Sequence, residues 1–218
     1  MNKYIMKLPQ LNLLTPDVNT TFKKLVEEIS ECNEAFETLS KFEEKYNINW
    51  LLLSDDELNR IRSDYKKLIN EFLFEIMDIA QVCVSQLFVF ETNGMDTKSV
   101  FDDYIEEDDE IIFEYKNNCK YFHLPRRTKD TSISETMNSI IKSMGIIAKL
   151  SKFTGENGEK PIMDINASNY KYVYELYNII QYCFDLIYIM NEKYNIDIKM
   201  LFDGHVNKLI KKGYVKLD

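Results

Sequence analysis

Two pairs of acidic residues are spaced so that both members of each pair share one face of a helix. Glu28 and Glu31 are three residues apart, and so are Glu75 and Asp78. Side chains three or four residues apart are neighbours on a helix surface. Carboxylate oxygens gathered in one place bind hard divalent cations and favour Mg²⁺ or Mn²⁺ over zinc. The chemistry open to these residues is therefore metal-assisted, provided that the chain brings the two pairs together.

The segments that carry the two pairs both have the apolar periodicity of amphipathic helices. The first predicted helix begins at Thr20 or Thr21 and ends near Tyr46, where the sequence Asn-Ile-Asn interrupts the pattern. The second begins at Ser54 and ends near Phe90. Its first residues, Ser-Asp-Asp-Glu, form a capping box, which is typical of a helix N-terminus. We therefore predict a helical hairpin over residues 20–90.

This hairpin would place the two acidic pairs at the same height. Glu28 lies about 27 Å from the turn and Glu75 about 30 Å from it, if each helical residue adds about 1.5 Å. In an antiparallel hairpin the four carboxylates could then face one point in space. Together they would repel one another and raise their own pKa values unless cations neutralised them.

A solvated helix face is the alternative interpretation of the acidic residues. Residues 71–90 contain 14 apolar residues, three acidic residues and no Lys or Arg. A solvated face usually mixes charges of both signs, so the composition favours a buried or metal-facing stripe. On spacing alone, however, a polar surface stripe is the simpler of the two interpretations.

The middle of the chain has a different pattern. Residues 91–130 begin with an Asn-Gly turn signal and contain seven acidic residues between positions 102 and 110. We interpret the acidic run as a solvated loop. Residues 111–115 and 120–124 could pair as a small β-hairpin, and a third helix is the alternative for this segment.

Helical periodicity returns in residues 131–218. We expect helices from Ser132 to about Phe153, from Asn166 or Ser168 to about Tyr194, and from Asp197 to Lys212. The predicted fold is all-α: one domain over residues 1–218, in which two antiparallel helical hairpins form a bundle with an irregular acidic insert. The second hairpin lacks a matching set of acidic residues, and only Asp185 could correspond to one of the acids of the first hairpin.

Composition excludes several classes of function. The chain has 218 residues, with 27 Lys and Arg against 36 Asp and Glu, which gives a formal net charge of −9. That balance argues against binding bulk nucleic acid or an anionic membrane through a basic face. The four cysteines are far apart without a CxxC motif, and no stretch is typical of a signal peptide or a lipid-exposed span. We expect a cytoplasmic protein.

The two acidic motifs in their context, EEISECNEA and EIMDIA, resemble the MazG-like, all-α nucleoside triphosphate pyrophosphohydrolases, a superfamily that includes the dimeric dUTPases. The resemblance implies that Glu28, Glu31, Glu75 and Asp78 hold Mg²⁺, with Mn²⁺ as a substitute. It implies cleavage of a (d)NTP to (d)NMP and pyrophosphate, and a homodimer.

The segment from His205 to Tyr214 is similar to the N-x-K … R-G-Y ending of some MazG-like proteins, in which Lys208 would contact phosphate. Among the acids, Glu31 and Glu28 are the expected catalytic residues, with Glu31 as the general base. The expected substrate-binding residues are Lys208, Asn207 and Lys149. We interpret His205 as a surface or capping histidine.

Three other functions stay open at this point. A dUTPase specificity for dUTP or dUDP is the nearest alternative, and base preference cannot be derived from the sequence. A catalytically inactive bundle that binds nucleotide or metal for regulation is the second. A helical adaptor without a ligand is the third, and it predicts no effect of Mg²⁺.

Overall fold

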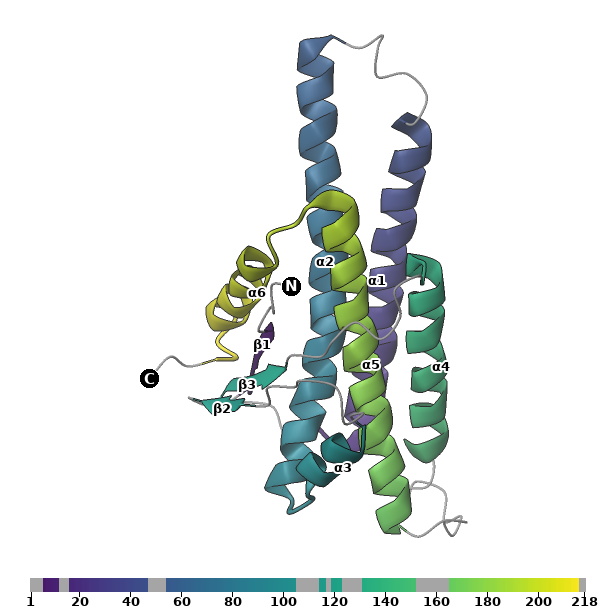
Figure 1. The fold of residues 1–218 in the computed structure, drawn as a ribbon, viewed down its shortest axis with the longest axis vertical. Helices are drawn as coiled ribbons and strands as arrows, with labels where there is room; N and C mark the ends of the chain where they lie inside the picture. The colour runs from purple at the N-terminus through teal and green to yellow at the C-terminus, as the bar shows by residue number, and fades with distance from the viewer. Residues whose placement is uncertain are drawn as a thin grey trace.

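The computed structural model confirms a mostly helical protein, with one small β-sheet beside the helices (Figure 1). The residues that it describes are 6–11, 16–46, 54–104, 114–116, 119–122, 131–151 and 165–215.

Four long helices form the body of the molecule: α1 (Val18–Tyr46), α2 (Asp55–Thr92), α4 (Ile133–Ser151) and α5 (Ile165–Tyr194). α1 packs against α2 and α4, and α5 packs against the same two helices. α1 and α5 run in one direction and α2 and α4 in the other, so each helix is antiparallel to both of its neighbours (Figure 1). α1 and α2 extend beyond α4 and α5 at the end where α1 finishes.

The apolar stretch at the end of the second predicted helix is the centre of the core. From Phe72 to Phe90, most α2 side chains are buried, because this half of the helix contacts α1, α5, α3 and α6. α2 is long and apolar enough to cross a membrane by length and composition, but 72% of its most apolar window is buried inside the protein. Packing within the molecule therefore explains its composition.

Most of the predicted helix termini are confirmed. Ser54 and Glu57 form a reciprocal capping box at the start of α2. Ser132 and Glu135 make the same pair of contacts at the start of α4. The prediction for α1 was wrong by one turn: Asp17, whose Oδ1 accepts from the Thr20 backbone N–H at 2.6 Å, caps the helix.

Two smaller helices and a three-stranded antiparallel sheet flank the bundle. The sheet has the order β1 (Met6–Pro9), β3 (Cys119–Phe122), β2 (Glu114–Lys116). β2 and β3 confirm the predicted hairpin, whereas the pairing of β1 with β3 was not predicted. The helix α3 (Thr97–Tyr104) packs against α5 and α2. A third helix was the alternative prediction for this part of the chain, without bounds. The acidic run lies largely outside the described residues.

The last helix, α6 (Ile198–Lys211), lies across the β1 side of α2. Asp197 caps its N-terminus by accepting from the Met200 backbone N–H at 2.9 Å. Gly213 follows it with a φ of +76°, in the left-handed region that a residue beyond a helix C-terminus commonly adopts. These two ends confirm the predicted helix over residues 197–212.

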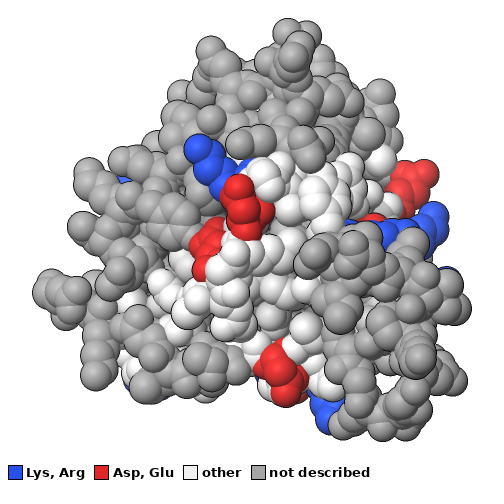
Figure 2. Space-filling view, turned by 90° about the horizontal axis from the view of Figure 1, so that it is seen from below, with Lys and Arg blue, Asp and Glu red and all other residues white. Residues whose placement is uncertain are grey.

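Charged residues are scattered on the end of the bundle that carries α3. Figure 2 looks at this end, and in its described part shows small groups of acidic and basic residues among uncharged ones. The described part of this face has no continuous basic patch.

The capping box at Ser54 gives a stability prediction. We expect Ser54→Ala to lower the free energy of unfolding by about 1 kcal/mol, because the backbone N–H of Glu57 loses its acceptor, the Ser54 hydroxyl. The measurement is urea denaturation followed by circular dichroism. Ser63→Ala, at an exposed position within the same helix, is the control and should change the value by less than about 0.5 kcal/mol. Equal effects of the two changes would contradict the assignment.

Candidate metal centre

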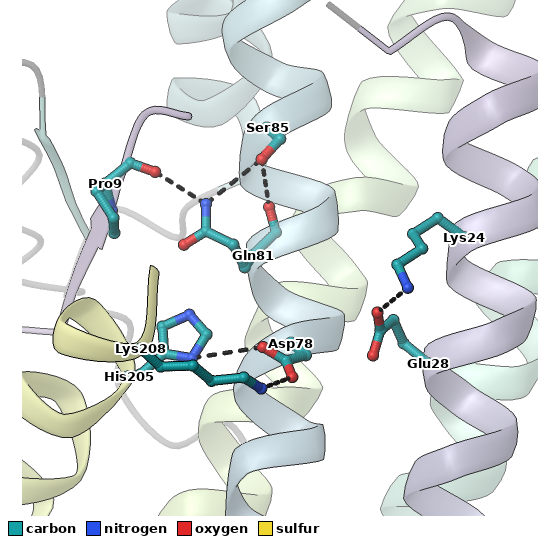
Figure 3. A network of polar contacts seen from close by, with 8 residues as sticks. All are labelled: Pro9, Lys24, Glu28, Asp78, Gln81, Ser85, His205 and Lys208. Atoms are coloured by element: carbon teal, nitrogen blue, oxygen red, sulfur yellow. Dashed lines mark hydrogen bonds and ion pairs between the residues drawn. The ribbon is translucent and has the colours of Figure 1, made fainter. Parts of the chain in front are cut away.

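Three carboxylates from two helices meet between α1 and α2. Glu28 comes from α1, and Glu75 and Asp78 come from α2. One oxygen of each lies within 4.8 Å of one oxygen of the other two. Figure 3 shows Glu28 extending from α1 toward α2, while the carboxylate of Asp78 faces His205 and Lys208 on α6. For these three residues, the equal heights expected from the sequence are confirmed.

Glu28 is buried because it occupies a core position of α1. Leu25, Glu28 and Cys32 follow one another at intervals of three and four residues, which places them on one face of the helix. Leu25 and Cys32 are fully buried, and Glu28 is only 6% exposed. The packing of α1 against the bundle thus carries the Glu28 carboxylate into the interface with α2.

Two lysines contact this group from opposite sides. Lys24 Nζ lies 2.6 Å from Glu28 Oε1, one helical turn earlier on α1. Lys208 Nζ, from α6, contacts Asp78 Oδ2. Both ion pairs are drawn in Figure 3. Partial burial lowers the pKa of Lys24, but its contacts with Glu27 and Glu28 outweigh this and raise it.

Within the described part of the chain, Glu75 has no such partner. Its Oε2 is buried without a hydrogen bond among the described residues. Burial raises the pKa of Glu75 to about 7, and the charge of Asp78 adds to this effect, while Lys208 opposes it. Burial also raises the pKa of Glu28, although the contact with Lys24 lowers it. The cluster is therefore short of positive charge at neutral pH.

His205 lies behind Asp78, and the prediction of a surface or capping histidine was wrong. The residue is fully buried on α6, and its Nδ1 lies 3.5 Å from Asp78 Oδ1. Burial lowers its pKa to about 4, with Asp78 opposing the shift. The ring is therefore neutral at pH 7. The histidine is buried because its position on α6 faces α2 and β1.

Glu31, the fourth predicted metal ligand, is exposed and lies outside the closely spaced group of three. Its charge nevertheless contributes to the raised pKa values of Glu28 and Glu75. Two other acids near the predicted pairs are exposed and lie in ion pairs, Glu27 with Lys24 and Glu71 with Lys67.

The three predicted substrate-binding residues lie in different places. Lys208 contacts the cluster directly. Asn207 and Lys149 are exposed, and neither has a recorded contact with the three carboxylates in the described part of the chain. Asp185, in the second half, is 2% exposed and accepts a hydrogen bond from Gln181 at 3.1 Å.

Sequence reasoning missed two further residues beside the site. Lys24 stands four residues before Glu28, a spacing that indicates an ion pair on a helix. Gln81, one turn after Asp78, donates from Nε2 to the Pro9 carbonyl at 2.8 Å and so attaches β1 to α2 (Figure 3). No local pattern predicts this second contact, because its partners are 72 residues apart.

The donor set suits a hard divalent cation. It contains only carboxylate oxygens, which Mg²⁺ and Mn²⁺ prefer, and one of these oxygens is buried without a partner. No family model, curated protein or solved structure matches the chain. Function is therefore inferred from the residues of the cluster.

The raised pKa of Glu75 predicts a pH-dependent stability. The folded protein keeps the Glu75 proton up to about pH 7, whereas an unfolded glutamate loses it near 4.5. Stability is therefore lost as the pH rises between these values. Without divalent metal at pH 8, we expect Glu75→Gln to stabilise the protein by about 1–2 kcal/mol, after allowance for partial exposure. At pH 5 the gain should be small.

Thermal unfolding in EDTA at the two pH values measures this effect. Glu71→Gln, an exposed position one turn earlier on α2, is the matched control and should show no gain at pH 8. A gain for Glu75→Gln that is the same at both pH values would contradict the charge-repulsion argument.

Proposed function

We propose that the protein is a Mg²⁺-dependent nucleotide pyrophosphohydrolase that cleaves a (d)NTP to (d)NMP and pyrophosphate. The observation that carries the proposal is the group of three carboxylates within 4.8 Å on two antiparallel helices. The bundle of α1, α2, α4 and α5 supports it further, because the MazG-like enzymes that the sequence resembles place their acids on two such helices.

The charges of the site explain why cation and substrate would bind together. A triphosphate carries about four negative charges, and carboxylates alone would repel it. Glu28, Glu75 and Asp78 would hold the cation, and Glu31 stands one turn from Glu28 at the exposed edge. Mg²⁺ held there would polarise the phosphorus centre and lower the pKa of the attacking water. The water oxygen would bond to phosphorus as the P–O bond between the α and β phosphates breaks, and pyrophosphate would leave.

Two residues of the chain have separate tasks in this proposal. Glu31 is exposed and outside the close group, so its carboxylate is available to take a proton from water. Lys208, with 31% of its side chain exposed, contacts Asp78 at the edge of the cluster. When the cation binds Asp78, the Lys208 ammonium group can leave Asp78 and contact a phosphate oxygen instead.

Turnover of nucleotides is the direct test. We expect pyrophosphate release from a panel of standard and modified dNTPs with Mg²⁺ or Mn²⁺, and none with EDTA. Loss of a residue that only orients a metal ligand costs roughly 10–100-fold in activity. Asp78→Asn and Glu28→Gln remove ligands themselves, so they should lower the rate by more than this. Glu71→Gln is the control and should retain the rate. Exclusive use of dUTP and dUDP would indicate a dUTPase.

Folded protein that releases no pyrophosphate from any substrate would overturn the enzyme assignment. Mg²⁺ binding without turnover would then indicate a regulatory bundle. An unchanged melting temperature with Mg²⁺ would indicate an adaptor without a metal site. The homodimer and the cytoplasmic location stay predictions.

Lys208 gives a second test, because the proposal assigns it opposite effects on two measurements. In the metal-free protein its ammonium contacts Asp78, so a cation that binds Asp78 must displace it. We expect Lys208→Met to bind Mn²⁺ several-fold more tightly without nucleotide, yet to hydrolyse nucleotide at least about tenfold more slowly. Isothermal titration calorimetry and pyrophosphate release measure the two effects.

Lys211→Met, at an exposed position in the last turn of α6, is the matched control for Lys208→Met. It removes the same charge from the same helix away from Asp78. Equal changes in both variants would show that the net charge of α6, rather than the contact with Asp78, controls the site.

A further inference from the structure

A fully buried histidine without hydrogen-bond partners lies next to the carboxylate cluster. His205 on α6 is 0% exposed, and neither Nδ1 nor Nε2 has a hydrogen bond among the described residues. Buried polar atoms nearly always have partners, since leaving them unpaired destabilises the fold. A leucine would fill a similar volume without that cost. The imidazole therefore calls for an explanation other than packing.

The ring faces one oxygen of Asp78. His205 Nδ1 is 3.5 Å from Asp78 Oδ1, whereas Lys208 contacts Oδ2 of the same carboxylate. The two α6 residues are three positions apart and so lie on one face of the helix. Figure 3 shows both side chains reaching Asp78 from the α6 side of α2. Each oxygen of Asp78 thus has its own neighbour on α6.

We propose that His205 is a positioning residue for Asp78, an inference that rests on the proposed role of Asp78 as a metal ligand. With its proton on Nδ1, the ring would present an N–H to the side of Oδ1. This contact would hold the carboxylate in place and leave Oδ2 for the cation once Lys208 is displaced. The separation of 3.5 Å is slightly longer than a hydrogen bond, and such contacts commonly shorten when the ligand binds. Outer-shell donors of this kind orient a ligand and tune its metal affinity.

Mn²⁺ affinity of the full chain, measured by isothermal titration calorimetry without nucleotide, tests the proposal. We expect His205→Leu to fold with an unchanged or higher melting temperature, because it removes two unpartnered polar atoms. Its Mn²⁺ affinity should fall by about tenfold. His205→Asn should recover most of that affinity, because its amide nitrogen stands close to the position of Nδ1. A purely structural histidine would show the opposite: lower stability and unchanged affinity.

Phe202→Leu separates positioning from the docking of α6. Phe202 lies one turn before His205, is 4% exposed, and packs edge-on against Phe184 with ring centroids 6.3 Å apart. This change loosens α6 without touching Asp78, so we expect a lower melting temperature and an Mn²⁺ affinity like that of the wild type. A tenfold loss of affinity in Phe202→Leu, or no recovery in His205→Asn, would overturn the proposal.

The wild type and Asp78→Asn distinguish this inference from the proposed function. If the wild type binds Mn²⁺ and Asp78→Asn does not, Asp78 is a ligand and the His205 variants decide the inference. If His205→Leu then binds as tightly as the wild type, the inference alone fails. If the folded wild type binds no Mn²⁺, the proposed function fails, and the inference fails with it.

Discussion

Repulsion between carboxylates is the constraint on which the arrangement around α1 and α2 depends. Glu28, Glu75 and Asp78 come within 4.8 Å of one another in a partly buried space. Lys24 and Lys208 supply two positive charges, and burial keeps a proton on Glu75 up to about pH 7. The docking of α6 on α2 is thus an electrostatic requirement as well as a packing one, because it brings Lys208 to Asp78.

The sequence predicts the long helices well, because their signals are local. Three- and four-residue apolar periods and the capping boxes at Ser54 and Ser132 place helix termini within a few residues. β1 could not be predicted in the same way. It has four residues, and its partner strand lies more than 100 positions away, with Met6 opposite Phe122. The bounds of α3 could not be predicted, because its eight residues give too short a pattern.

The site was predictable to the extent that helical spacing determines it. Equal distances from the turn bring Glu28 level with Glu75 and Asp78, as the structure confirms. The rotation of α1 decides which acid of the first pair turns inward. The core face of α1 carries Glu28 inside and leaves Glu31 exposed. His205 could not be assigned, because its burial depends on a helix docked from far along the chain.

The separation of Asp78 and Lys208 has a consequence for the order of events during synthesis. The two residues are 130 positions apart, and a ribosome that adds about 5–20 residues per second needs roughly ten seconds to cover that distance. Throughout this interval the hairpin of α1 and α2 has its acids but lacks the lysine of α6. Lys24 and dissolved cations are then the neutralising charges at hand, so divalent ions present during translation would favour early closure of the hairpin.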